Sequence, residues 1–395
     1  MKNAVKTAVV GLAMFSSAMA IESQYKDFYK YEVLNAKKVN VELTSNPYAQ
    51  IWKSVPGKYV YLYPQISVRL NDKKANELIA KKTLKRALVK VAYNNETIAV
   101  FVQWKDNTPS IQAKYDTDSY ADGVSIEFPN KFGKGITLPY VGMGDENHPV
   151  TVYLQKTVAG RDYEKVFISE GFGSLTEIKE EGTSIDMKYN KQTHLWTAVF
   201  VRPLKTENSN LKAGLVPIAF ALWDGKFAER DGNKSLSRWK FIRLKDYDLD
   251  KDYLNYVSWG IPSKKLGDPK RGKELMVQNG CNGCHRYADQ QSAPVGMAPD
   301  LSDIGGIANA PYLKESIVNP NDVIIRNLNP NRHYNKFANP DKFGAYPNND
   351  MFTWYTVNPD GTKSSKMPPY AHLSEKDLKD IVAYLKTLRN WKNFK

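Results

Sequence analysis

Hydrophobic and polar residues alternate through much of the first two-thirds of the chain, a pattern typical of strands with one buried face. The clearest pair of runs, 87–93 and 97–104, flanks Asn94-Asn95 and predicts a β-hairpin. Further alternating runs occur at 59–70, 124–128, 150–155, 195–201, 216–223 and 239–244. Turn signals such as Asp-Gly separate them, and no helical pattern lies between them. We therefore predict an all-β antiparallel sandwich over residues 21–260.

A helical pattern replaces this alternation near residue 261. Asp268 as an N-cap and Pro269 in the first turn predict a short helix that ends near residue 277. The clearest helix of the chain is predicted over 374–391, where Ser374 opens an approximate capping box. Its apolar residues share one face, namely Leu378, Ile381, Val382, Leu385 and Leu388. We expect residues 261–395 to form a second, all-α domain.

Residues 1–20 have the pattern of a secretory leader. Lys2 and Lys6 precede an apolar stretch over 7–15, and the segment ends in Ala18-Met19-Ala20. The apolar stretch is shorter than the roughly 18 residues that a membrane-spanning helix needs, which argues against an uncleaved anchor. We expect cleavage after Ala20 and export to the periplasm.

Composition and charge narrow the possible functions. With 42% hydrophobic and 25% charged residues, the chain has ordinary globular composition, and 395 residues suffice for two domains. The 56 basic and 42 acidic residues give a net charge of +14, but no block of five like charges occurs. This spread excludes a nucleic-acid-binding tail and favours a weakly acidic partner.

The chain has only two cysteines, Cys281 and Cys284, and His285 follows them directly. A disulfide across so short a loop would add little stability. The C-x-x-C-H pattern indicates covalent attachment of haem c, because thiols one helical turn apart can reach two vinyl groups while the histidine binds the iron. A zinc site would lack ligands, since only four other histidines and no other cysteine remain. A thioredoxin-like pair would need a βαβ context that this sequence does not predict.

The second axial ligand of this haem iron is expected later in the chain. Met367 is followed by Pro368 and Pro369, which stiffen the backbone that presents the thioether. Met297 and Met351 are the alternatives, and neither has this proline frame. Methionine as sixth ligand raises the reduction potential of the haem and occupies the last coordination position of the iron. We therefore expect electron transfer and not oxygen or peroxide chemistry.

These parts together resemble class I c-type cytochromes over roughly 264–390. The helix before the cysteines, the segment Pro299-Asp300-Leu301, the Met-Pro-Pro loop and the closing helix follow in the family's order. One departure is the long span between His285 and Met367. It contains residues 319–365, rich in Asn, Pro and Tyr, which we interpret as an insertion that covers one side of the haem or meets a partner.

The predicted sandwich carries a less explicit signal. Taken alone, Met143 between two glycines and Lys234 in a Gly-Asn-Lys-Ser turn would be a loop methionine and a solvated lysine. However, the segments 122–129, 140–150, 195–202, 219–225 and 229–235 follow one another as in the haem b subunits of type II dimethyl sulfoxide reductase-family enzymes. That family includes ethylbenzene dehydrogenase, selenate and chlorate reductases, and nitrite oxidoreductase.

The resemblance implies a β-sandwich that holds one non-covalent haem b, with Met143 and Lys234 as its axial ligands. Lys226 is the second choice for the lysine ligand and Lys240 the third. A lysine ligand must be neutral, so burial and the iron must overcome its usual pKa of about 10.4. We therefore expect that removal of haem b destabilises this domain.

Together, the two resemblances predict a dihaem electron-transfer subunit, not catalytic alone, of an exported molybdenum enzyme complex. Its partners would be a molybdenum-containing catalytic subunit, an iron–sulfur subunit and an external redox protein, most similar to nitrite oxidoreductase-type complexes. The alternative is a stand-alone periplasmic c-type cytochrome whose sandwich binds substrate or carbohydrate through Trp52, Trp104 or Trp223. A haem enzyme would need an open iron and an acid or base such as His148, His333 or His372.

Overall fold

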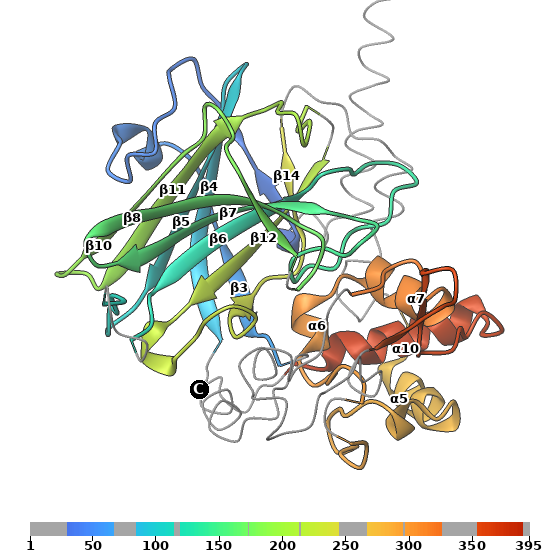
Figure 1. Ribbon diagram of the computed structural model, residues 1–395. Coiled ribbons are helices and arrows are strands. Elements are labelled where there is room, and N and C mark those ends of the chain that lie inside the picture. The colour runs from blue at the N-terminus through green and yellow to red at the C-terminus, as the bar shows by residue number, and fades with distance from the viewer. Residues whose placement is uncertain are drawn as a thin grey trace, which may run out of the picture.

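The structure, a computed structural model, describes residues 30–66, 84–113, 119–172, 174–212, 215–244, 267–294, 297–325 and 354–389. A β-domain and a smaller helical body lie side by side (Figure 1). The predicted leader, the domain junction near residue 261 and the centre of the 319–365 segment lie outside the described residues. The proposed domain boundary therefore stays a prediction.

In the described residues the β-domain forms one mainly antiparallel, 14-stranded sheet, in which eleven strands follow the order β10-β11-β5-β4-β3-β13-β12-β6-β7-β8-β9 and β14 pairs with β12 beside this path. Two short pairs, β1 with β14 and β2 with β4, are parallel. The bounds are β1 (Val33–Asn35), β2 (Lys37–Lys38), β3 (Gly57–Pro64), β4 (Lys85–Tyr93), β5 (Thr97–Lys105), β6 (Gly123–Pro129), β7 (Val150–Val158), β8 (Arg161–Ser169), β9 (Leu175–Ile178), β10 (Ser184–Asn190), β11 (Leu195–Pro203), β12 (Leu215–Trp223), β13 (Ser235–Leu236) and β14 (Lys240–Arg243).

The sheet folds over itself into two layers, with β6, β7, β8 and β12 in front of β4, β5 and β11 in Figure 1. Between the layers, alternate residues of the two sets of strands meet in one buried cluster that includes Val89, Val102, Ile126 and Phe220. The prediction of an antiparallel β-sandwich is confirmed. The predicted hairpin is β4–β5, and Asn94 closes its turn by accepting the N–H of Thr97 at 2.8 Å.

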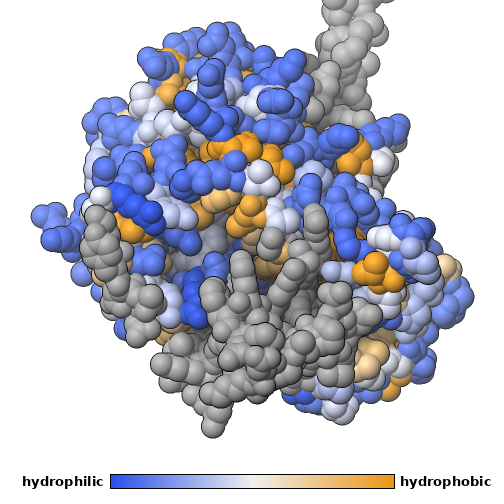
Figure 2. Space-filling view, viewed as in Figure 1, coloured by the Kyte–Doolittle hydropathy of each residue, from blue (hydrophilic) through white to orange (hydrophobic). Residues whose placement is uncertain are grey.

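A second apolar cluster covers the outer face of the front layer and continues into the helical body. Leu154 and Trp223 belong to it, and so do Leu313 and Leu385 from the helices. Figure 2 shows hydrophobic residues gathered in the middle of this view, with hydrophilic residues over most of the remainder. The two parts of the chain therefore share a buried core.

The helical body consists of α5 (Pro269–Gln278), the 3₁₀ turn η5 (Cys281–Gly283), α6 (Ile304–Ile307), α7 (Ala310–Val318) and α10 (Glu375–Thr387). The predicted caps are confirmed: the side chains of Asp268 and Ser374 accept backbone N–H groups of the first turns of α5 and α10. Gly272 lets α5 cross α10 closely, because a Cβ there would overlap the Asp380 carbonyl. None of the helices in the described ranges has the length and apolar character needed to cross a bilayer.

The helical body is joined to the β-domain by direct contacts. Asn309 donates to the Trp239 carbonyl at 3.2 Å, and Gly306 packs so closely on the Tyr63 ring that any side chain there would overlap it. Next to this contact Arg238 donates to the Gly305 carbonyl, and Arg238 and Lys240 both pair with the buried Glu32. These contacts fix how the two parts of the chain face each other.

Candidate haem-binding sites

Helix α5 delivers the C-x-x-C-H segment to the centre of the helical body. The helix is followed by Gly280, whose φ of 71° turns the chain into η5. Cys281 is half-buried against the shared apolar cluster, and Cys284 is exposed. Both are free thiols, and the Cys281 carbonyl accepts the N–H of His285 at 2.9 Å, which holds the three residues in one turn.

The environment of His285 suits an iron ligand. Its Nδ1 lies 2.9 Å from the Pro299 carbonyl oxygen, which can only accept a hydrogen bond. The proton is therefore on Nδ1, and the lone pair of Nε2 is available to a metal. Burial lowers the pKa of His285, which favours the neutral ring that coordination requires.

Met367 follows a short hairpin of β15 (Tyr355–Val357) and β16 (Lys363–Ser365) and packs against the same apolar cluster as Cys281. Its N–H donates to Ser365 Oγ at 3.1 Å. Tyr370, three residues on, donates its hydroxyl to the Asn279 carbonyl at 3.1 Å, next to the cysteine turn. The structure thus places the Met-Pro-Pro loop beside the C-x-x-C-H segment.

The two rival methionines differ from Met367. Met297 is 48% exposed, in a loop. Met351 lies outside the described residues. Of the described candidates, Met367 is the one that packs on the cluster with the cysteine turn.

Met143 occupies a tight turn in front of β7. Its φ of 95° is unusual for a residue other than glycine and marks a strained backbone. Two donors hold this turn through the Met143 carbonyl, which accepts Ser169 Oγ at 2.7 Å and the Gly171 N–H at 2.9 Å. A strained and firmly held methionine is more typical of a functional position than of a loop residue that only covers core.

Lys234 lies just before β13 and is 3% exposed. Its Nζ is 5.3 Å from the centre of the Trp223 ring and makes no hydrogen bond to another described residue. Burial lowers the pKa of Lys234 to about 8, against the opposing charge of Glu127. The amine therefore loses its proton more readily than a solvated lysine, as a metal ligand must.

Two buried side chains link the Met143 turn to Lys234. Glu127 accepts a hydrogen bond from the Met143 N–H and faces the charge of Lys234, while burial raises the pKa of Glu127 to about 8. The Gln65 N–H donates to the Lys234 carbonyl at 2.8 Å, and the Gln65 side-chain amide donates to the Tyr140 hydroxyl at 3.1 Å. Glu127 Oε1 and Gln65 Oε1 have no hydrogen-bond partner among the described residues. The sequence analysis missed both; a carboxylate inside the apolar run 124–128 was the signal for Glu127.

The sheet face beside these residues is suited to a flat ligand. Ser125, Ala219 and Ala221 are small, and the register pairs Ala221 with Ser125 and Ala219 with Glu127. The larger Trp223 closes one end of this row. A flat apolar surface with a thioether, a buried amine and unpaired polar atoms at its margin fits a porphyrin with its axial ligands.

Comparisons with known proteins show which proteins the chain is similar to. The family model for cytochrome c matches residues 269–389. The chain is 27% identical over 246 residues to the gamma subunit of chlorate reductase from Ideonella dechloratans. The matched region covers 60% of this chain and 97% of that protein. It is 26% identical over 208 residues to the gamma subunit of dimethylsulfide dehydrogenase from Rhodovulum sulfidophilum. This match covers 49% of this chain and 73% of that protein. The chain is thus similar to gamma subunits over at most 60% of its length, and its residues 269–389 match cytochrome c.

Solved structures are similar to this chain only at a low level. A family 9 carbohydrate-binding module from Caldicellulosiruptor kristjanssonii is 10% identical, with a TM-score of 0.33 and coverage of 55% of this chain and 96% of the module. A likeness of this size carries no functional argument. The expected carbohydrate platforms are also buried, since Trp52, Trp104 and Trp223 are 4%, 4% and 6% exposed.

The other two lysines considered as haem b ligands are less suitable, since one is exposed and the other is already paired. Lys226 is an exposed residue of the short turn η2 (Gly225–Phe227). Lys240 is buried, but its Nζ lies 2.7 Å from Glu32 and 3.0 Å from the Tyr31 carbonyl. Lys234 is the lysine that combines burial with the lack of a hydrogen bond among the described residues.

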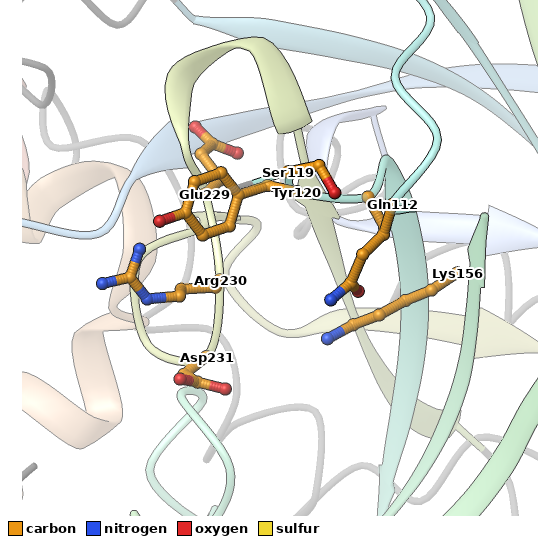
Figure 3. A pocket seen from close by; sticks show the side chains of 8 residues that line it. Gln112, Ser119, Tyr120, Lys156, Glu229, Arg230 and Asp231 are labelled. Carbon is orange, nitrogen blue, oxygen red and sulfur yellow. The ribbon is translucent and has the colours of Figure 1, made fainter. Parts of the chain in front are cut away.

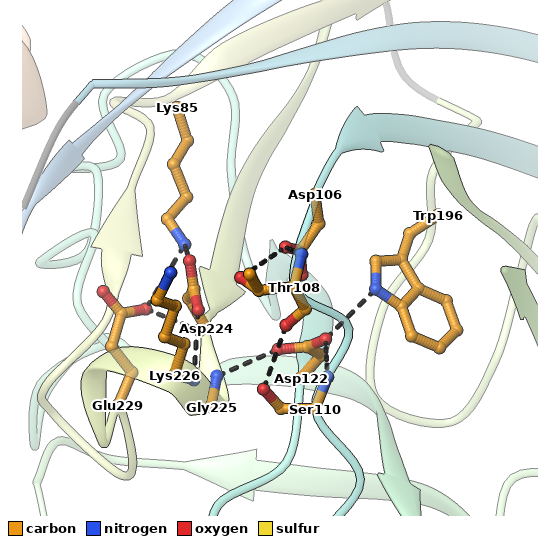
Figure 4. A network of polar contacts seen from close by, with 10 residues as sticks. All are labelled: Lys85, Asp106, Thr108, Ser110, Asp122, Trp196, Asp224, Gly225, Lys226 and Glu229. Carbon is orange, nitrogen blue, oxygen red and sulfur yellow. Dashed lines mark hydrogen bonds and ion pairs between the residues drawn. The ribbon is translucent and has the colours of Figure 1, made fainter. Parts of the chain in front are cut away.

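A cluster of three carboxylates, Asp106, Asp122 and Asp224, supports the loops next to Trp223 (Figure 4). Asp122 accepts the Gly225 N–H at 2.9 Å and Trp196 Nε1 at 3.1 Å, and Asp224 pairs with Lys85 at 2.9 Å. Burial raises the pKa of Asp122 to about 7. Because the protein's own donors occupy these oxygens, we interpret the cluster as a structural network.

Proposed function

We propose that this chain is a dihaem electron-transfer subunit, not catalytic alone, of an exported molybdenum oxidoreductase complex. It would relay electrons between an iron–sulfur subunit, which serves a molybdenum-containing catalytic subunit, and an external redox partner in the periplasm. The names of the two gamma-subunit relatives support this assignment, and the fused cytochrome c domain favours a complex like nitrite oxidoreductase or nitrate reductase. The direction of electron flow is left open.

In this proposal the cytochrome c domain holds haem c through Cys281 and Cys284, with His285 and Met367 on the iron. The β-domain holds haem b between Met143 and Lys234. Each haem, when bound, supplies one-electron redox chemistry. With two protein ligands on each iron, no open position is left for His148 or His372 to assist, and His148 is instead paired with Asp145 at 2.8 Å. His333 lies outside the described residues.

The observation that carries the relay is the contact between the two ligand-bearing loops. Glu146, three residues after Met143, forms an ion pair with Lys363, four residues before Met367. The neighbouring Asn147 donates to the Asp322 carbonyl at 3.2 Å. These contacts hold the two ligand-bearing loops side by side, which supports transfer within one chain.

Aromatic residues continue this contact. The Tyr140 ring, in the segment that leads to Met143, lies 6.1 Å from the ring of Tyr312 on α7 and 6.2 Å from that of Phe172. These spacings are those of packed aromatic pairs. They leave no layer of solvent between the β-domain and the cytochrome c domain at this point.

The test of the proposed function is the haem content of the purified chain. A pyridine haemochrome assay before and after acid–acetone extraction should find one covalent haem c and one extractable haem b per chain. The double variant Cys281→Ser, Cys284→Ser should lose the covalent haem alone. A single covalent haem in the wild-type chain would support the stand-alone cytochrome instead.

Replacement of Met367 by histidine should lower the midpoint potential of haem c, because bis-histidine ligation favours ferric iron relative to His–Met ligation. Redox titration in the haem c α-band measures the shift. Met297→His is the matched control and should leave the potential unchanged. The ligand assignment is wrong if the control shifts the potential and Met367→His does not.

Reversal of the charge at Glu146 should slow electron transfer between the two haems. A half-exposed ion pair is worth about 0.5–1 kcal/mol, so the Glu146→Lys variant should transfer electrons about twofold to fivefold more slowly. Pulse radiolysis that reduces haem c and follows haem b measures this rate. The swapped pair Glu146→Lys, Lys363→Glu should restore it; a rate unchanged in both variants would show that this contact does not govern transfer.

A further inference from the structure

A cavity of about 440 Å³ opens beside β7, next to the Lys234 site (Figure 3). Gln112 and Lys156 extend into it from one side, and Tyr120 and Arg230 face them from the other. The carboxylate network around Asp122 supports these walls, because it anchors the loops on which Tyr120 and Arg230 lie. The cavity is therefore built by ordered parts of the β-domain.

Three donor side chains border this cavity without a hydrogen-bond partner. The side chains of Gln112, Lys156 and Arg230 make no hydrogen bond or ion pair with another described residue. Arg230 stacks on the Tyr120 ring at 4.9 Å, which leaves its N–H groups available. The carboxylates of Glu229 and Asp231 also line the cavity; Glu229 is already paired with Lys85, and Asp231 faces the charge of Lys156. The unused donors of the two cations and the amide still suit an anion that accepts several hydrogen bonds, such as a carboxylate.

The cavity lies next to the proposed haem b site, and this position points to the carboxylates of that haem. Lys156 Nζ lies 5.6 Å from the centre of the Trp223 ring, and Lys234 Nζ lies 5.3 Å from the same centre. Trp223 Nε1 also donates to the carbonyl of Asp231, which lines the cavity, at 3.1 Å. The cavity and the proposed amine ligand thus lie against the same indole ring.

We propose that this cavity binds the propionate carboxylates of the haem held by Met143 and Lys234, with Lys156 as the principal cation and Gln112 and Arg230 as further donors. The inference rests on the proposed function and adds to it how the porphyrin is oriented in the site. An apolar sheet face under the ring and the unused donors of this cavity at its edge favour the arrangement in which the propionate end of the porphyrin points toward Lys156. The same donors could bind a free anion, so the experiment must distinguish a free anion from the haem carboxylates.

The test compares haem with its dimethyl ester, in which both carboxylates are masked. The full chain, with haem c retained and haem b extracted, is titrated with each ligand and followed in the Soret band. The wild-type chain should bind haem about tenfold to a hundredfold more tightly than the ester. In Lys156→Met this ratio should fall to near one, because haem loses affinity and the ester does not. Lys165→Met, on the neighbouring strand and paired with Glu177, is the control and should keep the wild-type ratio.

Other outcomes overturn the inference in distinguishable ways. If Lys156→Met weakens haem and ester equally, Lys156 only supports the fold; if the ratio stays at the wild-type value, the carboxylates bind elsewhere. If inorganic phosphate binds the haem-loaded wild-type chain, but not Lys156→Met, the cavity serves a free anion. If the wild-type chain binds neither haem nor ester, the haem b part of the proposed function itself fails.

Discussion

Replacement of Lys234 by alanine is expected to abolish the extractable haem and to leave the covalent haem in place. The amine is buried, its pKa is lowered by that burial, and no described residue accepts a hydrogen bond from it. Its removal leaves Met143 as the single protein ligand, and a thioether alone is a weak one. The haem content after extraction measures the loss directly.

The same variant should also lower the stability of the β-domain. A ligand bound at a concentration of a thousand times its Kd contributes about 4 kcal/mol to the free energy of unfolding, and this contribution disappears with the haem. Thermal unfolding of the haem-loaded wild-type chain and of the variant should therefore differ. Lys226→Ala is the matched control, because Lys226 is exposed in a neighbouring turn. If Lys226→Ala loses the haem and Lys234→Ala keeps it, the ligand assignment is wrong.

The second large effect is expected at Glu32, the centre of a buried charge cluster between the β-domain and the cytochrome c domain. Its carboxylate accepts a two-point contact from Arg238 and lies 2.7 Å from Lys240. Arg238 also donates to the Gly305 carbonyl at 3.4 Å, and Lys386 of α10 donates to the Ala308 carbonyl at 2.5 Å. Arg238 thus ties α6 to the β-domain, and Lys386 ties α10 to the residue that follows α6.

Glu32→Gln should destabilise the chain by about 3–5 kcal/mol, because the variant leaves buried cations without their counter-charge. Chemical denaturation of the haem-loaded chain measures the loss. Glu42→Gln, at an exposed position, is the control and should change the free energy of unfolding by less than about 0.5 kcal/mol. The additional change Lys240→Met should recover part of the loss. Equal effects at positions 32 and 42 would contradict this role of Glu32.

The pH dependence of stability follows from the same group. The charges of Arg238 and Lys240 outweigh burial and lower the pKa of Glu32 from 4.5 to about 2. The unfolded chain therefore binds the proton more tightly, so this stabilisation is fully present above about pH 4.5 and is lost as the pH falls toward 2. The loss is on the order of 3 kcal/mol. Glu32→Gln should remove this part of the acid sensitivity, as denaturation at a series of pH values would measure.

Local patterns were enough to predict the features whose parts lie close together in the chain. The caps at Asp268 and Ser374 and the β4–β5 hairpin at Asn94 each depend on residues at most a few positions apart, and the structure confirms them. The predicted closing helix extends to residue 391, but α10 ends at Thr387. There the chain turns back, and the Leu388 carbonyl accepts the Gly305 N–H at 2.9 Å. A contact with α6 thus overrides the local helical pattern.

The sequence by itself determined the cytochrome c signature, because two thiols and an imidazole within five residues suffice to define its chemistry, and it determined the all-β character of the first domain through its alternation. Met143 and Lys234 were singled out by resemblance, not by their own local pattern. Only the tertiary structure decided that Glu127 and Gln65 lie between them, that Lys240 is paired with Glu32 from 208 positions away, and that Lys156 borders a cavity beside Trp223. The physical reason is that burial and charge pairing depend on which strands become neighbours, and that order is set by the packing of the whole sheet.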